Sequence, residues 1–158
     1  MSNLLEIGES APTFTLSNHK GETINLKDNL GQWLILYFYP KDNTPGCTTE
    51  AQDFTRLTPE FAKLSAKIIG ISPDSEKSHC KFIDKYDLSI ELLCDPDHTV
   101  AKAYDFWNLK KFMGKEYKGI IRSTFIINPE GNIAYIWSKV RVKNHGEKVL
   151  NQLQELQS

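Results

Sequence analysis

The sequence has few cysteines and no closely spaced pair of them. Its 158 residues contain three, Cys47, Cys80 and Cys94. An odd number does not fit the disulfide framework of a small secreted domain. The lack of a CxxC pair argues against a zinc ribbon and against the dithiol of a disulfide-exchange protein. We therefore expect the thiols to be catalytic, metal-binding or inert rather than structural.

Long apolar runs and an excess of charge of one sign are also missing. The longest apolar run, 33–39, is far shorter than the ~20 residues of a membrane-spanning helix. The opening residues "MSNLLEIGESAP" contain no cationic region followed by a long apolar one, so no secretory signal is expected. Nineteen basic and twenty acidic residues give a net charge of −1, without a basic run for nucleic acid or anionic lipid. The predicted location is the cytoplasm, with no nucleic-acid or membrane partner.

The composition that remains is that of a folded protein. Apolar residues make up 40% of the chain and charged residues 25%, a balance typical of soluble globular proteins. The length predicts one domain, 1–158, which buries roughly 68–70% of the surface of its unfolded chain. No repeat, linker or low-complexity segment divides it.

Predicted strands and helices alternate along the chain. A hairpin is expected in 14–26, buried strands at 33–39, 67–72 and 90–94, and a second hairpin from 120–127 and 132–138. Helices are expected from Cys47 to Leu57, bent or broken at Pro59 and continuing over 60–66, from Asp74 or Ser75 to 88, briefly within 95–106, and over 144–157. Residues 107–119 are predicted to form a lysine-rich surface loop. This order predicts an α/β fold with a central mixed sheet flanked by helices.

The segment 38–54, "FYPKDNTPGCTTEAQDF", places Cys47 alone at the start of a helix. An ordinary thiol, with a pKa near 8.5, is only about 3% thiolate at pH 7, and ionising most of it takes about 3.4 kcal/mol. A helix N-terminus supplies at most ~2 kcal/mol, so a second cation is needed. Arg122, charged within the apolar run "GIIRSTFII", is the candidate, with Cys47 or Glu50 as its anion. The alternative is that Arg122 lies at a strand edge or end and reaches water.

Thr44 and Pro40 complete the candidate site. The Pro-Gly turn after Thr44 could fold its hydroxyl towards the sulfur, beside the free N–H groups of residues 46 and 47. Donors placed in this way would stabilise the leaving oxygen of a breaking O–O bond. Thr44 could instead cap the helix or stabilise the turn, and Pro40 could either close one side of the pocket or simply end a strand.

These residues carry a family resemblance. "YPKDNTPGCTTE" resembles the active-site loop of the peroxiredoxins, with Pro40, Thr44 and Cys47 on the motif positions, and Arg122 matches the downstream arginine. The similarity extends over most of the chain and is greatest to the Q-type, or bacterioferritin comigratory protein, branch. It implies a thioredoxin-like fold and an antioxidant enzyme that reduces hydrogen peroxide and organic hydroperoxides. Cys47 would be the peroxidatic cysteine, cycling through thiolate, sulfenic acid and disulfide. The resemblance further implies a thioredoxin-type reductant, a monomer, and neither cofactor nor metal.

The thiol that would react with the Cys47 sulfenic acid, the resolving thiol, has more than one candidate. Many Q-type members carry it five residues after the peroxidatic cysteine, where this chain has Gln52. Others carry it on the next helix, near Ile83, and Cys80 lies one turn earlier on the same face. Cys94 ends an apolar strand and is expected to belong to the core. Either Cys80 resolves the sulfenic acid or an external thiol reduces Cys47 directly.

Two alternative hypotheses assign the protein to other functional classes. A zinc-binding module could use His79, Cys80, Cys94 and His98, although His79 and Cys80 diverge by about 100° on a helix. A thioredoxin-like disulfide exchange protein would be the alternative enzyme. His79, His98 and His145 are otherwise predicted to be surface or helix-end residues without a role.

Overall fold

The computed structural model describes residues 5–112 and 115–158. Its main sheet has seven strands in the order β2-β1-β5-β4-β3-β8-β9. Their bounds are β1 Thr15–Asn18, β2 Thr23–Asn25, β3 Trp33–Phe38, β4 Ala66–Ser72, β5 Glu91–Cys94, β8 Ser123–Ile127 and β9 Ile133–Trp137. Strands β3, β4 and β5 are parallel, whereas β1, β2, β8 and β9 pair antiparallel with their neighbours. The predicted mixed sheet, N-terminal hairpin and second hairpin are confirmed.

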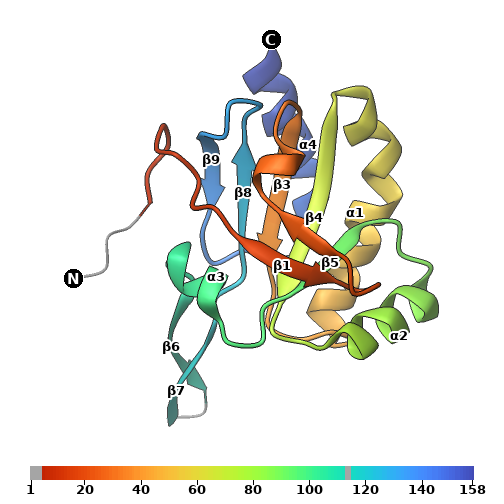
Figure 1. Cartoon of the computed structure of the whole chain (residues 1–158), viewed down its shortest axis with the longest axis vertical. Coiled ribbons are helices and arrows are strands. Elements are labelled where there is room, and N and C mark those ends of the chain that lie inside the picture. The colour runs from red at the N-terminus through yellow and green to blue at the C-terminus, as the bar shows by residue number, and fades with distance from the viewer. Residues whose placement is uncertain (1–4, 113–114) are drawn as a thin grey trace.

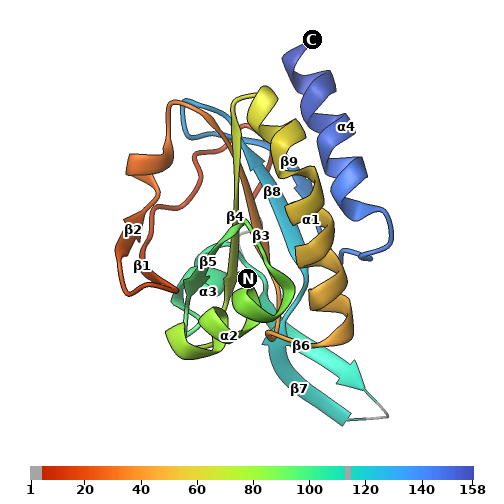
Figure 2. The same ribbon diagram turned by 90° about the vertical axis from the view of Figure 1, so that its right-hand side faces the viewer.

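Helices cover both faces of this sheet (Figure 1). They are α1 Pro45–Lys63, α2 Glu76–Tyr86, α3 Thr99–Ala103 and α4 His145–Gln157, with a short 3-10 helix at Lys27–Asn29. Helices α1, α2 and α4 contribute to one apolar core, through side chains such as Phe54, Phe82 and Val149. Helix α3 and the N-terminal segment close the other core, with Tyr104 and Phe14. Figure 2 shows α1 and α4 running side by side over their face of the sheet.

Helix α1 is longer and more regular than predicted. It begins at Pro45, two residues before Cys47, and continues through Pro59 without a break. Proline is favoured in the first turn, where its missing N–H has no intrahelical partner to lose. At Pro59 one backbone hydrogen bond is lost. The buried side chains Phe54 and Phe61, on either side of Pro59, anchor the helix to the core there.

The predicted surface loop at 107–119 is wrong. Residues on both sides of 113–114 form an antiparallel ribbon, β6 Trp107–Phe112 and β7 Lys115–Ile120, which projects from one end of the molecule in both views (Figures 1 and 2). The tip, 113–114, lies outside the described residues. Lysine has a low β-strand propensity, but this preference is weak. In the ribbon, pairing of the two strands satisfies their backbone N–H and C=O groups and outweighs it.

This ribbon also changes the context of Arg122. The predicted strand 120–127 is divided, because Ile120 ends β7 and β8 begins only at Ser123. Arg122 therefore precedes β8 rather than lying within an apolar strand. Its carbonyl accepts a hydrogen bond from Val140 N–H, and the preceding Ile121 N–H donates to Phe106. These bonds hold the backbone on both sides of the guanidinium-bearing residue.

No helix in the described part of the chain has the length and apolar character needed to cross a membrane.

Candidate active site

Cys47 lies in the first turn of α1, where the loop from β3 enters the helix. Asn43 has a positive φ of 60°, and Thr44 occupies the N-cap position in an extended conformation. The first intrahelical bond is donated by Thr48 N–H to Thr44, so the N–H groups of Gly46 and Cys47 have no helical partner. The Cys47 side chain is only 1% exposed. The positive end of the helix dipole is therefore directed at a buried thiol.

Arg122 joins the thiol to a buried carboxylate. Its Nη2 lies 3.3 Å from Cys47 Sγ, and its Nη1 donates to Glu50 Oε1 at 2.8 Å. The Arg122 side chain is 18% exposed and that of Glu50 1%. The guanidinium is thus held by two acceptors that lie three residues apart on one face of α1. It does not extend freely into water.

Burial and charge compete in this group. Burial away from water raises the pKa of Glu50 to about 7, and the nearby Arg122 opposes this by favouring the carboxylate. For Arg122, burial lowers the pKa, but Glu50 and Cys47 outweigh it and raise the pKa above its ordinary value. The guanidinium is therefore permanently cationic, and Glu50 changes charge near neutral pH.

Thr44 and Pro40 lie in the same loop. The Thr44 hydroxyl donates to the Lys41 carbonyl at 2.9 Å and makes no capping bond to the helix. Because the hydroxyl proton is used in this bond, the Thr44 oxygen can act towards a further partner only as an acceptor. Pro40 is half-buried and follows Tyr39, whose N–H makes the last bond of β3 to β4, at Ile71. Because proline has no N–H, the pairing ends there and the chain turns towards Thr44.

Gly46 contributes more to the site than the free N–H group that the sequence predicted. A Cβ at this position would lie 3.1 Å from Arg122 Nη2. The absence of a side chain therefore lets the guanidinium approach both the helix N-terminus and the sulfur. The PG pair before Cys47 was visible as a turn signal, but the close approach of Arg122 depends on the tertiary fold.

The other two cysteines occupy different surroundings. Cys80, on α2, is half-buried, and its Sγ donates to the His19 carbonyl at 2.9 Å. Cys94 ends β5 in the core. Burial is the main reason that its pKa is raised to about 11, and nearby acidic groups add to the effect. All three thiols are free. The structure brings Arg122 and Glu50 to Cys47, but it leaves Cys80 bound to another segment.

The predicted zinc set does not assemble. Among the described residues, the potential ligands that converge are Asp42, Asp74 and His79, without Cys80, Cys94 or His98. His98 instead stacks on Trp107, with ring centroids 3.7 Å apart. The prediction that His79 lies at the surface is also wrong, since its side chain is fully buried. Its position three residues before Phe82, on the apolar side of α2, was the sequence signal for burial.

His145 is likewise buried rather than on the surface. Its Nε2 lies 2.8 Å from Thr124 Oγ1, and its ring packs edge-on against Phe54 and Trp137. Burial lowers its pKa to about 4, so the ring is neutral at pH 7. It fills the space between α4, α1 and the sheet below Arg122.

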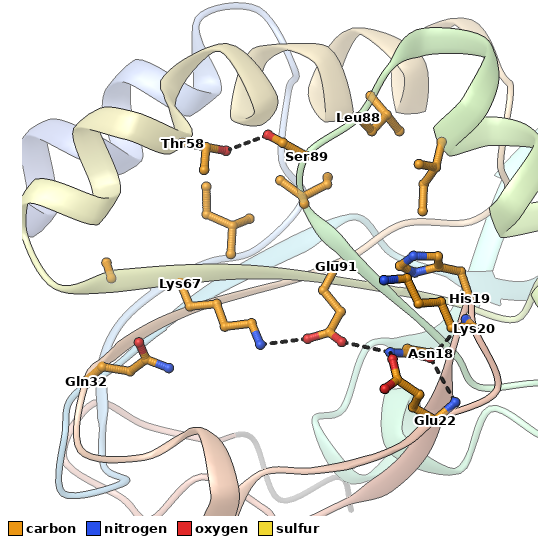
Figure 3. Close-up of a pocket in the computed structure, with 14 residues that line it drawn as sticks. Asn18, His19, Lys20, Glu22, Gln32, Thr58, Lys67, Leu88, Ser89 and Glu91 are labelled. Atoms are coloured by element: carbon orange, nitrogen blue, oxygen red, sulfur yellow. Dashed lines mark hydrogen bonds and ion pairs between the residues drawn. The ribbon is translucent and has the colours of Figure 1, made fainter.

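A separate hollow lies between α1, α2 and the β1–β5 side of the sheet (Figure 3). It has a volume of about 490 Å³ and contains none of the predicted site residues in its lining. Lys67 and Glu91 form an ion pair of 2.7 Å across it, and Asn18 donates to Glu91 at 3.0 Å (Figure 3). These groups satisfy one another, so the hollow offers no counterpart to the Cys47 site.

Comparisons with known proteins agree with this geometry. Residues 7–136 match the model of the AhpC/TSA family. Peroxiredoxin Bcp of Bacillus subtilis is 51% identical over 96% of this chain and 97% of its own. The structure of Xanthomonas campestris bacterioferritin comigratory protein, described in terms of its alkyl peroxide reduction activity, is 43% identical, with a TM-score of 0.88 over 92% of both chains. A cysteine-to-serine mutant of Xylella fastidiosa PrxQ superposes with a TM-score of 0.92 at 38% identity, covering 98% of both.

The predicted thioredoxin-like fold and the predicted family are thereby confirmed. The chain belongs to the AhpC/TSA family and is a peroxiredoxin of the Bcp type, a thiol peroxidase that acts through a peroxidatic cysteine.

Proposed function

We propose that Cys47 is the peroxidatic cysteine and that Thr44, Arg122 and Pro40 form its pocket. The observation that carries this assignment is the contact of 3.3 Å between Arg122 Nη2 and Cys47 Sγ at the N-terminus of α1. A guanidinium and a helix dipole on one sulfur both favour the thiolate. The other two thiols have neither: Cys80 donates to a carbonyl and Cys94 is buried among acidic groups.

The reaction follows from this arrangement. The Cys47 thiolate attacks the terminal oxygen of a hydroperoxide, an S–O bond forms and the O–O bond breaks. The sulfur is oxidised to sulfenic acid, and the departing alkoxide or hydroxide takes a proton and leaves as alcohol or water. Arg122, together with the free N–H groups of Gly46 and Cys47, stabilises the negative charge that passes onto the peroxide oxygens. Thr44 accepts a hydrogen bond from the peroxide through its free lone pairs, and Pro40 closes the loop side.

The substrates we infer are hydrogen peroxide and alkyl hydroperoxides. Support for the alkyl peroxides comes from the X. campestris relative, whose structure is described for that activity. The peroxide group is small and polar, which suits a buried thiol beside the free N–H groups of a helix N-terminus. The reductant we propose is a thioredoxin-type protein, acting on a monomer in the cytoplasm, where free thiols such as these persist.

Resolution then follows one of two routes. In the first, Cys80 condenses with the Cys47 sulfenic acid, releasing water and forming a disulfide. This needs the two Cα atoms within about 7 Å, so the start of α1 must unwind and Cys80 must leave the His19 carbonyl. In the second, an external thiol attacks the sulfenic acid directly.

The test is turnover of cumene hydroperoxide by the wild-type chain and three cysteine variants, with thioredoxin and thioredoxin reductase as electron source. We expect Cys47→Ser to abolish alcohol formation and Cys94→Ser to retain it. Cys80→Ser distinguishes the routes, because it stops turnover with thioredoxin only if Cys80 resolves. Full activity in Cys47→Ser would overturn the assignment.

A further inference from the structure

The loop that precedes Cys47 is held by a group of buried polar contacts centred on Asp42. Asp42 Oδ1 accepts from the Tyr39 hydroxyl at 2.6 Å, and Oδ2 accepts from the Ser78 hydroxyl at 2.8 Å. His79 Nδ1 lies 2.7 Å from the same Oδ2. Asp42 is 6% exposed and His79 0%. A carboxyl group from the loop before Cys47 is thus buried against the first turns of α2.

The contacts of the His79 ring fix its protons. Nε2 lies 2.9 Å from the Leu93 carbonyl oxygen, which only accepts hydrogen bonds, so Nε2 carries a proton. Nδ1 faces a carboxylate oxygen that already accepts from Ser78, so a proton must also lie between Nδ1 and Asp42. The His79 ring and the Asp42 carboxyl group are therefore joined by a buried hydrogen bond of 2.7 Å.

This pair acts on the backbone that carries Thr44. Asp42 N–H donates to Asp74 Oδ2 at 2.7 Å, so the loop is held by its main chain as well as by its side chain. The next residue, Asn43, has a φ of 60° and accepts from the Tyr86 hydroxyl at 2.9 Å. Helix α2 and its leading turn therefore fix two successive residues immediately before Thr44 and the start of α1.

We propose that His79 is a positioning residue for peroxide reduction: its Nδ1–H holds Asp42, and through Asp42 it fixes the 40–44 loop that places Thr44 and the N–H groups of Gly46 and Cys47 around the peroxide. The inference rests on the proposed role of Cys47. Arg122 reaches the sulfur from the segment before β8, and within the described residues its side-chain hydrogen bonds go to Cys47 and Glu50. Loss of the pair should therefore disturb alignment of the peroxide more than ionisation of the thiol.

Two substitutions separate the ring's two hydrogen bonds. In His79→Asn the amide nitrogen falls near the position of Nδ1 and still donates to Asp42. In His79→Gln the longer amide reaches the position of Nε2 and still donates to Leu93, but leaves Asp42 without this donor. Both variants lose the imidazole from the core, so a general loss of packing affects them alike, and each is the matched control of the other.

The readout is a ratio of two rates at Cys47. Stopped-flow oxidation by cumene hydroperoxide depends on alignment of the O–O bond, whereas alkylation by iodoacetamide depends on the thiolate fraction and on access to the sulfur, but not on that alignment. In His79→Gln we expect oxidation to slow by about tenfold, the scale of a small misplacement, with alkylation unchanged. In His79→Asn the rate of oxidation relative to alkylation should fall less than in His79→Gln. Equal ratios in wild type, His79→Asn and His79→Gln would overturn the inference. Failure of wild-type Cys47 to react faster than Cys80 and Cys94 would instead overturn the proposed function.

A measurement on the wild-type protein tests the same claim without a variant. In the NMR spectrum of the reduced enzyme labelled with ¹⁵N-histidine, we expect the proton between His79 Nδ1 and Asp42 to exchange slowly with solvent, because the hydrogen bond is buried. Exchange as fast as that of an exposed histidine would show that His79 does not hold Asp42, and the positioning role would be lost.

Discussion

Arg122 binds Cys47 and Glu50 with two different nitrogens of one guanidinium, at 3.3 Å to the sulfur and 2.8 Å to the carboxylate. The carboxylate therefore fixes the direction from which the cation meets the thiol. The charge of Arg122 favours the Cys47 thiolate, and its forked guanidinium lets it bind both acceptors. Arg122 is therefore the first residue to test.

Replacing Arg122 by methionine should slow the oxidation of Cys47 by peroxide about 10- to 100-fold, because a charge-assisted hydrogen bond worth roughly 1.5–3 kcal/mol is lost. Arg122→Lys keeps the charge but cannot reach both acceptors, so we expect an intermediate rate. Stopped-flow measurement with one peroxide compares the three proteins. A methionine variant as fast as wild type would show that the contact has no role in the reaction.

Gly46→Ala should separate activity from stability. The added Cβ would lie 3.1 Å from Arg122 Nη2, which forces the guanidinium to shift. At the same time alanine favours a helix over glycine by about 0.5–1 kcal/mol. We expect the melting temperature to be unchanged or raised, while peroxide reduction slows several-fold. Calorimetry and the peroxidase assay on the same sample check this, and an unaltered rate would argue against a close Arg122 in the working enzyme.

His145 should make the protein less stable as the pH falls. Its pKa is about 4 in the folded state, below the ordinary value near 6.5, so between these values the unfolded chain binds more protons. The stabilisation, up to about 3 kcal/mol, is present above pH 6.5 and is lost as the pH falls towards 4. In His145→Gln, urea unfolding at a series of pH values should lack this contribution. A pH dependence identical to that of wild type would contradict it.

Glu50 should make the protein less stable as the pH rises, over nearly the same pH range as the effect of His145. Its pKa of about 7 lies above the ordinary value of 4.5, so the folded protein binds more protons between the two. This contribution is present below pH 4.5 and is lost as the pH rises through 7. In wild type it largely offsets that of His145, and the stability should vary little from pH 4.5 to 7. Glu50→Gln should reveal the His145 slope, and stability rising with pH in that variant is the expected result. A flat profile in Glu50→Gln would contradict the assignment.

Oxidation should loosen the first turns of α1 if Cys80 resolves. The Cys47 side chain is buried and Cys80 is bound to the His19 carbonyl, so neither thiol meets the other without local unwinding. We expect faster amide exchange in residues 46–56 of the oxidised protein than of the reduced protein. Unchanged exchange, together with a trapped sulfenic acid, would favour direct reduction by an external thiol.

The sequence was sufficient for the elements whose patterns are local. The apolar run 33–39 predicted β3, and the helices expected from Asp74 or Ser75 and over 144–157 agree with α2 and α4. The loop from Pro40 to Cys47 carried its own motif, so the candidate cysteine could be chosen in advance. These features depend on residues close together in the chain.

Features that depend on tertiary contacts were harder to predict. Arg122 was chosen for being charged among apolar residues, yet it lies between β7 and β8, because the chain leaves the ribbon there. His79 and Asp42 are 37 residues apart, so no local pattern in the sequence indicated that they form a hydrogen bond. The ribbon β6–β7 was missed because its lysines resemble those of a loop.

Peroxide reduction by this enzyme requires that Cys47 is its one activated thiol. Fully reduced protein, treated with one equivalent of hydrogen peroxide and then with separate reagents for thiols and sulfenic acid, can be mapped by mass spectrometry. We predict that the first oxidation occurs at Cys47 alone, as sulfenic acid or as a disulfide to Cys80, with Cys94 still reduced. Slow and equal oxidation of all three cysteines would contradict the central claim.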